Sequence, residues 1–162
     1  MVQLSTGDML RAAIKDGTPV GVKVKSVLAA GELVSDDIMV DLIGERLDQP
    51  DTARGVIFDG YPRTQAQAEG LDKALDEAGR EIDRVICLNA PDDEITARML
   101  ARGRADDTAE VIGNRLSVYR DETAPVFKYY SDRGLTVEIN GVGEIDEVHD
   151  RVYAATKVGA ES

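Results

Sequence analysis

The chain has 162 residues, of which 43% are hydrophobic and 31% are charged, and its formal net charge at pH 7 is −12. This length and composition predict one globular domain with a substantial apolar core. The negative charge disfavours general binding to nucleic acid, although a local cluster of arginines could still bind a small phosphate-bearing ligand. No apolar run is long enough to span a membrane, and the first residues lack the pattern of a signal peptide.

The first quarter of the chain predicts a short strand and three helices. Residues 2–4 resemble the end of an apolar strand, and the polar loop 5–8 leads into a helix. Thr18 and Pro19 predict the start of the next helix, and Gly31 its end. Ser35 caps a third helix. Its expected buried stripe consists of Ile38, Met39, Leu42, Ile43 and Leu47.

The remaining sequence alternates strands and helices, which is typical of a parallel α/β sheet. The runs 55–58 and 84–88 have little polar alternation and are predicted to be buried strands. The other expected elements are a helix from Thr64 to near Gly79, one from Pro91 to near Gly103, a helical stretch over 107–132 kinked or broken at Pro125, a strand over 135–139 and a helix over 144–157.

A loop that follows the predicted strand 55–58 is the first candidate site. Ligands of parallel α/β folds bind beyond the carboxyl ends of the strands, and this loop has the sequence DGYPRT. Gly60 permits an unusual backbone conformation, Pro62 stiffens the loop, and the planar guanidinium of Arg63 suits a phosphate. A plain strand-to-helix turn with a solvent-facing arginine explains the same residues.

Two further features favour anions. The transition at 5–8 places hydroxyls and Arg11 at a helix N-terminus, where anions bind well, although an ordinary capped helix has the same pattern. Arginines are also concentrated between residues 98 and 120, and they could surround several phosphates or form a solvated helix face. These arginines are Arg98, Arg102, Arg104, Arg115 and Arg120.

Six segments taken together resemble the adenylate kinase family. They are STGDMLR, GELV, FDGYPRTQAQ, RMLARGRADD, NRLSVYRDETAPV and NGVG, in the family order and spacing over essentially all 162 residues. The resemblance implies a P-loop kinase-like α/β fold in one domain, with a helical AMP-binding region over 5–34 and a short lid over 101–107. This short form leaves no room for a zinc-binding insertion.

The resemblance also implies roles for individual residues. Asp59 would organise Mg²⁺ through water, and the arginines around it would stabilise the phosphates during transfer. The implied catalytic residues are Arg63, Arg98, Arg102, Arg104, Arg115 and Asp59. The implied AMP-binding residues are Thr6, Arg11, Glu32, Leu33, Val34, Gly60, Tyr61, Pro62, Arg63, Gln67, Arg104 and Arg115, and the implied ATP-binding residues are Arg98, Arg102 and Gly143.

The implied reaction is MgATP + AMP ⇌ 2 ADP by in-line transfer, with Thr6 and Gln67 matching the pattern that accepts adenine. No covalent intermediate and no acid–base residue is required. The only histidine, His149, is expected to be exposed and receives no role.

One part of the family pattern does not occur in these residues. The family begins with an apolar strand, a phosphate loop of the form GxxxxGK[ST] and a helix, whereas this sequence contains no Gly-Lys pair. The family places that strand between the strands predicted at 55–58 and 84–88, which would then lie about 10 Å apart. A fragment or internal start, a short variant with a re-paired sheet, or a contribution from another chain would each explain this, and we favour the first.

Two other functions are consistent with the sequence. The chain could bind AMP without transferring a phosphoryl group, or it could be an acidic interaction protein that binds no nucleotide. The lone Cys87 rules out an intrachain disulfide and fits the cytoplasm. The resemblance implies a monomer with nucleotides as its partners and no nucleic acid or membrane, although an open sheet could drive dimerisation or strand exchange.

Overall fold

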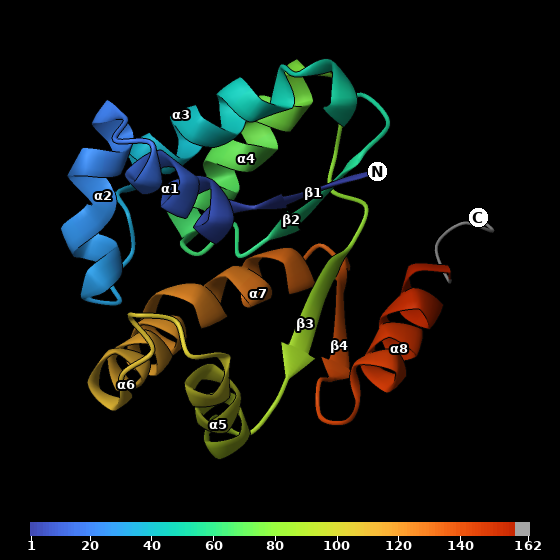
Figure 1. The fold of residues 1–162 in the computed structure, drawn as a ribbon. Coiled ribbons are helices and arrows are strands. Elements are labelled where there is room, and N and C mark those ends of the chain that lie inside the picture. Colours follow the sequence, from blue (N-terminus) through green and yellow to red (C-terminus); the bar gives the residue numbers. More distant parts are fainter. Residues whose placement is uncertain (158–162) are drawn as a thin grey trace.

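The computed structural model describes residues 1–157, which form a mixed α/β fold with two halves (Figure 1). The first half contains β1 (Val2–Ser5), α1 (Thr6–Lys15), α2 (Pro19–Ala29), α3 (Asp36–Leu47), a 3₁₀ turn (Pro50–Thr52), β2 (Val56–Asp59) and α4 (Gln65–Glu77). The second contains β3 (Val85–Asn89), α5 (Asp92–Arg102), α6 (Ala109–Val118), η2 (Tyr119–Thr123), α7 (Ala124–Ser131), β4 (Thr136–Asn140) and α8 (Ile145–Lys157).

The strands form two separate parallel pairs, one in each half. In the first pair Val2 of β1 lies opposite Val56 of β2, and Ser5 lies opposite Asp59. In the second pair β3 lies beside β4 with Val85 opposite Thr136. No ladder joins β2 to β3 among residues 1–157, so the break expected between these strands is present and the sheet has not re-paired across it.

Side-chain caps place several helix starts where the sequence predicts them. The hydroxyl of Thr18 accepts a hydrogen bond from the backbone N–H of Gly21, and that of Thr64 accepts one from Gln67. Each bond satisfies a backbone donor that the first helical turn leaves unpaired. Ser35 occupies the predicted cap position of α3, but its side chain makes no capping bond.

The largest core cluster lies between the helices of the first half. Met39 and Ile43 of the predicted α3 stripe are fully buried there, and Ile38, Leu42 and Leu47 pack against them as partly buried residues. The other buried members of this core are Leu10, Val24, Val34, Tyr61, Leu71 and Leu75. A second, smaller cluster of Ala68, Val126 and Tyr130 joins α4 to α7.

Three sequence predictions about local structure are wrong in detail. The polar segment predicted as a loop over 5–8 contains no loop: Ser5 ends β1 and caps α1 by accepting a hydrogen bond from the backbone of Asp8, and α1 begins at Thr6. Each later strand begins one residue after its predicted start. The strands predicted to be buried expose Ile57 by 54% and Leu88 by 52%, so the face of the sheet at these two side chains is not covered.

The predicted kink near Pro125 is a π-helical turn. Residues 109–131 run through α6, η2 and α7 without a break, and the backbone N–H of Ala124 bonds to the carbonyl of Tyr119, five residues earlier. Proline lacks the N–H that a regular helix requires and crowds the preceding turn, so the widened turn accommodates it. None of the helices in the described part of the chain is long and apolar enough to cross a membrane.

Candidate active site

A cavity of about 140 Å³ lies where the two halves meet. The first half contributes the start of α1, the segment 31–34 and the loop after β2, and the second contributes the end of α5, Arg104 of the following loop and Arg115 in the last turn of α6. The predicted residues that line it are Thr6, Arg11, Glu32, Leu33, Val34, Gly60, Arg63, Gln67, Arg102, Arg104 and Arg115. Residues from widely separated segments therefore meet at one site.

The loop after β2 holds Arg63 through its backbone and its side chain. The Nε of Arg63 donates to the carbonyl of Gly60 at 2.9 Å, and the backbone N–H of Arg63 donates to Oε1 of Gln67 at 2.8 Å. Gly60 has a φ of +73°, and a Cβ there would lie 2.9 Å from Nη2 of Arg63. The positive φ therefore favours glycine here, and the guanidinium lies against the position that a Cβ would occupy.

Thr6 and Gln67 form a buried polar wall of the cavity. Both residues are 2% exposed. The Thr6 hydroxyl donates to the carbonyl of Gly60 at 3.0 Å. Because the backbone of Arg63 occupies Oε1 of Gln67, the amide orientation is defined, and Nε2 is the atom of this side chain left to donate to a ligand.

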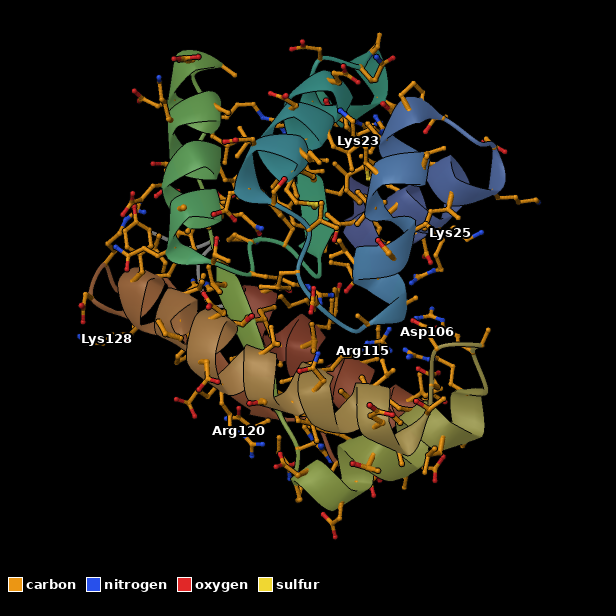
Figure 2. The ribbon with its side chains drawn as sticks, turned by 90° about the vertical axis from the view of Figure 1, so that its left-hand side faces the viewer. Lys23, Lys25, Asp106, Arg115, Arg120 and Lys128 are labelled. Carbon is orange, nitrogen blue, oxygen red and sulfur yellow. The ribbon has the colours of Figure 1, made fainter. Side chains whose placement is uncertain are left out.

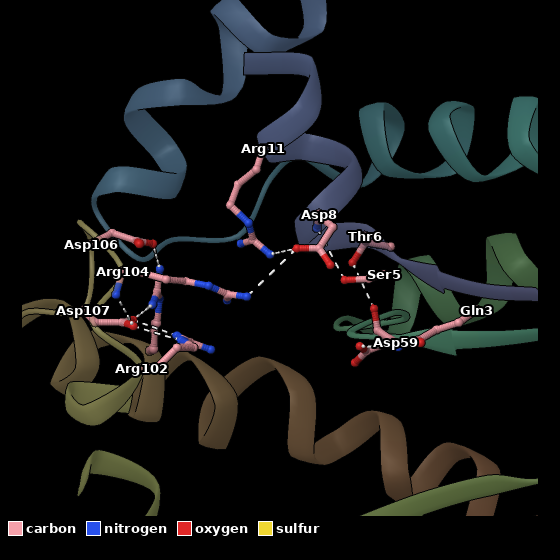
Figure 3. Close-up of polar contacts among 11 residues, drawn as sticks. Gln3, Ser5, Thr6, Asp8, Arg11, Asp59, Arg102, Arg104, Asp106 and Asp107 are labelled. Atoms are coloured by element: carbon pink, nitrogen blue, oxygen red, sulfur yellow. Dashed lines mark hydrogen bonds and ion pairs between the residues drawn. The ribbon is translucent and has the colours of Figure 1, made fainter. Parts of the chain in front are cut away.

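Asp8 lies between two arginines of the cavity (Figure 3). Its carboxylate is 2.5 Å from Nη2 of Arg11 and 4.0 Å from Nη2 of Arg104. The hydrogen bond from Arg11 lowers the pKa of Asp8. This carboxylate links an arginine of the first half to an arginine of the second half.

Asp107 organises the arginines of the α5–α6 connection. Its side chain is fully buried and accepts hydrogen bonds from Nε and Nη2 of Arg102, at 2.9 and 2.7 Å, and from Nη1 of Arg115 at 3.0 Å. The backbone N–H of Arg104 donates to it at 3.1 Å. The bonds from Arg102 lower the pKa of Asp107 to about 2. Arg115 also pairs with Asp106, and Figure 2 places these two residues together.

The cavity has an excess of positive charge near Arg63. Desolvation by the surrounding protein lowers the pKa of Arg63, and the charges of Arg115 and Arg11 lower it further, while Asp59 raises it. No group among residues 1–157 accepts a hydrogen bond from the terminal nitrogens of Arg63. Like charges held in one site repel each other, and a bound anion relieves that repulsion.

Arg98 makes its contacts outside the cavity. It pairs with Glu94 at 2.7 Å, and its terminal nitrogens donate to the carbonyls of Gly141 and Gly143 at 3.0 and 3.5 Å. Of the arginines predicted between residues 98 and 115, Arg102, Arg104 and Arg115 line the cavity and Arg98 does not. The fold instead places Arg98 beside Gly143, the other residue that the resemblance assigns to ATP.

Three more predicted residues do not line the cavity. Tyr61 is 6% exposed and belongs to the core, and Pro62 continues the loop toward Arg63. Asp59 ends β2 and accepts a hydrogen bond from Gln3 at 3.1 Å.

Six residues that line the cavity were not predicted from the sequence as site residues. They are Gly7, Leu10, Leu28, Gly31, Met39 and Met99. The spacing of apolar residues in α1 and α3 could have indicated that Leu10 and Met39 are buried in the core, but not that they line the cavity.

The described residues contain no group of three or more His, Cys, Asp or Glu side chains arranged to hold a metal ion. Mg²⁺ in phosphoryl-transfer sites keeps several waters and uses one or two carboxylates together with substrate phosphates. The solvent-exposed carboxylate of Asp59, at the end of β2, is consistent with that mode.

The chain is similar to known adenylate kinases along nearly its whole length. A family model described as adenylate kinase matches residues 1–135. An adenylate kinase of Stenotrophomonas maltophilia (strain K279a) is 47% identical over 161 residues, which cover 97% of this chain and 86% of the relative. An adenylate kinase of a Nocardioides species is 44% identical, and the match covers 98% of this chain and 85% of the relative. Adenylate kinase 1 of a Nostoc species is 49% identical, and the match covers 93% of this chain and 82% of the relative.

Proposed function

The chain belongs to the adenylate kinase family, and we propose that it acts in reversible phosphoryl transfer, MgATP + AMP ⇌ 2 ADP. One observation carries the proposal: the cavity where the two halves meet is lined by Arg11, Arg63, Arg104 and Arg115. Guanidinium groups match the geometry of phosphate oxygens and remain charged at neutral pH.

AMP is proposed to occupy this cavity with its phosphate at the arginines. Arg11 and Arg63 approach from the first half, and Arg104 and Arg115 from the second. Thr6, Gln67 and the segment 32–34 are proposed to surround the adenine and ribose. Nε2 of Gln67, which makes no hydrogen bond to residues 1–157, supports this arrangement, because it can donate to a ring nitrogen of the base.

ATP is proposed to bind on the side of Arg98, Arg102 and Gly143. The bonds from Arg98 to the carbonyls of Gly141 and Gly143 support this, because they join α5 to the loop after β4. Arg102 borders the cavity on the same helix, and it could contact phosphates of both nucleotides.

The proposed mechanism depends on positioning and on neutralising charge. The arginines hold the acceptor phosphate and spread the charge of the transferred group, while closure of the segment 101–107 over the site excludes water. Mg²⁺, when bound with ATP, neutralises developing phosphate charge. Asp59 is the residue proposed to hold it, through water.

We propose nucleotides as the partners, and a monomer in the cytoplasm. The free Cys87 supports that location, because a protein without disulfide bonds is stable in a reducing compartment.

The test measures ADP formation and AMP binding by this chain, by Arg63→Ala and by Arg120→Ala. Arg120 pairs with Asp92 on the surface, away from the cavity, so its variant removes the same charge without touching the site (Figure 2). We expect AMP binding to be lost in Arg63→Ala and kept in Arg120→Ala. Equal AMP affinity in the parent and in Arg63→Ala would contradict the proposed pocket.

ADP formation needs its own comparison, because the 162 residues contain no GxxxxGK[ST] motif. Activity in the parent and in Arg120→Ala but not in Arg63→Ala would support transfer by the chain as given. AMP binding without ADP formation in any variant would contradict transfer by these residues and leave the AMP site intact.

A further inference from the structure

The π-helical turn η2 carries a contact that the proposed reaction does not assign. The hydroxyl of Thr123 donates to the backbone carbonyl of Arg63 at 2.9 Å, across 60 positions of sequence. Thr123 is the last residue of η2, directly before α7. The contact therefore joins a long helical stretch of the second half to the loop of the first half that bears Arg63.

This contact completes the support of the Arg63 backbone. The N–H of Arg63 donates to Gln67, its Nε donates to the carbonyl of Gly60, and its own carbonyl accepts from Thr123. Of these bonds, only the one from Thr123 comes from the second half. Its loss would leave the backbone of Arg63 without a hydrogen bond from the second half, while the bonds from Gln67 and from Thr6 to the loop remain within the first half.

The first two residues of the π turn contact β3 and α5. The Tyr119 hydroxyl lies 3.9 Å from the sulfur of Cys87 on β3. Arg120 pairs with Asp92 of α5 at 2.9 Å, but both side chains are largely exposed, so this surface pair adds little to the position of the turn. A π turn contains one more residue per turn than a regular helix, so it shifts the side chains after it around the helix axis. Single π turns inside α-helices are frequent at functional sites, which fits the position of Thr123 beside the loop of Arg63.

We propose that Thr123 is a positioning residue for the phosphate site: its hydroxyl fixes the backbone of Arg63 so that the guanidinium meets the phosphate of AMP. The proposal rests on the function proposed above. It adds a residue that touches no nucleotide and acts through Arg63.

The experiment compares Thr123→Val with Thr123→Ser by calorimetric titration of AMP and of adenosine. Valine keeps the shape of threonine without the hydroxyl, and serine keeps the hydroxyl. We expect Thr123→Val to raise the dissociation constant of AMP by about five- to tenfold, the effect of one hydrogen bond. Adenosine affinity should stay unchanged, because adenosine has no phosphate, and Thr123→Ser should bind AMP like the parent.

A matched control is Thr96→Val. The Thr96 hydroxyl also donates to a backbone carbonyl, that of Asp92 at 2.7 Å, but it lies on α5 and outside the cavity. Its variant should leave AMP affinity unchanged. Unchanged AMP affinity in Thr123→Val, or an equal loss for AMP and adenosine together with a lower melting temperature, would overturn the positioning role. A parent chain that binds no AMP would overturn the proposed function, and this inference with it.

Discussion

Asp107 illustrates how a single residue can organise several others. A carboxylate with no exposed surface is unfavourable unless charged donors surround it, and here Arg102, Arg115 and the backbone of Arg104 supply them. These contacts restrict the two guanidinium groups that border the cavity. Asp107 therefore supports both the stability of the connection between α5 and α6 and the shape of the site.

We expect Asp107→Asn to destabilise the chain by about 1–2 kcal/mol, because it weakens the charged hydrogen bonds from Arg102 and Arg115. Urea unfolding monitored by circular dichroism measures this change. Asp150→Asn is the matched control, since the side chain of Asp150 is 84% exposed. A loss in Asp107→Asn no larger than that of the control would contradict this role.

The lowered pKa of Asp107 also predicts a pH dependence. A carboxyl group whose pKa falls from 3.8 to about 2 on folding contributes its full stability above pH 3.8 and loses it as the pH falls toward 2. The parent should therefore lose more stability between pH 4 and pH 2 than Asp107→Asn does. If the urea midpoints of the two proteins fall by the same amount between pH 4 and pH 2, Asp107 is not responsible for the loss of stability.

At the scale of elements, the end of α2 makes a close contact with α6. Gly31 has a φ of +73°, and a Cβ on it would lie 2.9 Å from Cγ1 of Val111 and 3.1 Å from the Val111 carbonyl. Asn114 adds a hydrogen bond to the carbonyl of Ala30 at 2.9 Å. The sequence indicates the glycine as a helix end, but only the fold shows that it also admits a neighbouring helix.

We expect Gly31→Ala to cost about 3 kcal/mol of stability and Gly79→Ala about 1 kcal/mol. Gly79 has a similar φ of +65°, but a Cβ on it would have no neighbouring atom within 4 Å, so its variant measures backbone strain alone. The difference between the two free energies of unfolding measures the clash with α6. Equal losses would mean that α6 moves aside without cost.

At the scale of the whole molecule, the candidate site joins the two halves. Its walls come from residues 6–67 and from residues 99–115. The strand pairs do not connect across the halves, so contacts such as the bond from Tyr129 to Asp72 at 2.8 Å hold α7 against α4. A ligand that contacts both sides should therefore stabilise the molecule as a unit.

AMP at 100 times its dissociation constant should stabilise the parent by about 2.7 kcal/mol. For a chain of this size the melting temperature then rises by about 5–10 °C. The rise should be absent in Arg63→Ala and present in Arg120→Ala. The absence of any rise in the parent under these conditions would favour an interaction protein that binds no nucleotide.

The elements follow largely from local sequence. Thr18, Thr64 and Gly103 mark helix ends because capping bonds and left-handed backbone involve residues only a few positions apart. The six matching segments outlined the candidate site. Most of the residues assigned to that site do line one cavity, but their proposed roles stay predictions.

The sequence by itself determined the helices, the parallel strands and the residue types available to bind a phosphate. Only the tertiary structure decided that Asp107 is buried, that Arg98 contacts the loop after β4, and that Thr123 reaches Arg63. Local rules act over one or two helical turns, whereas these contacts depend on which faces of distant elements meet. The exposure of Ile57 and Leu88 has the same cause, because strand burial depends on neighbours that the strand sequence does not specify.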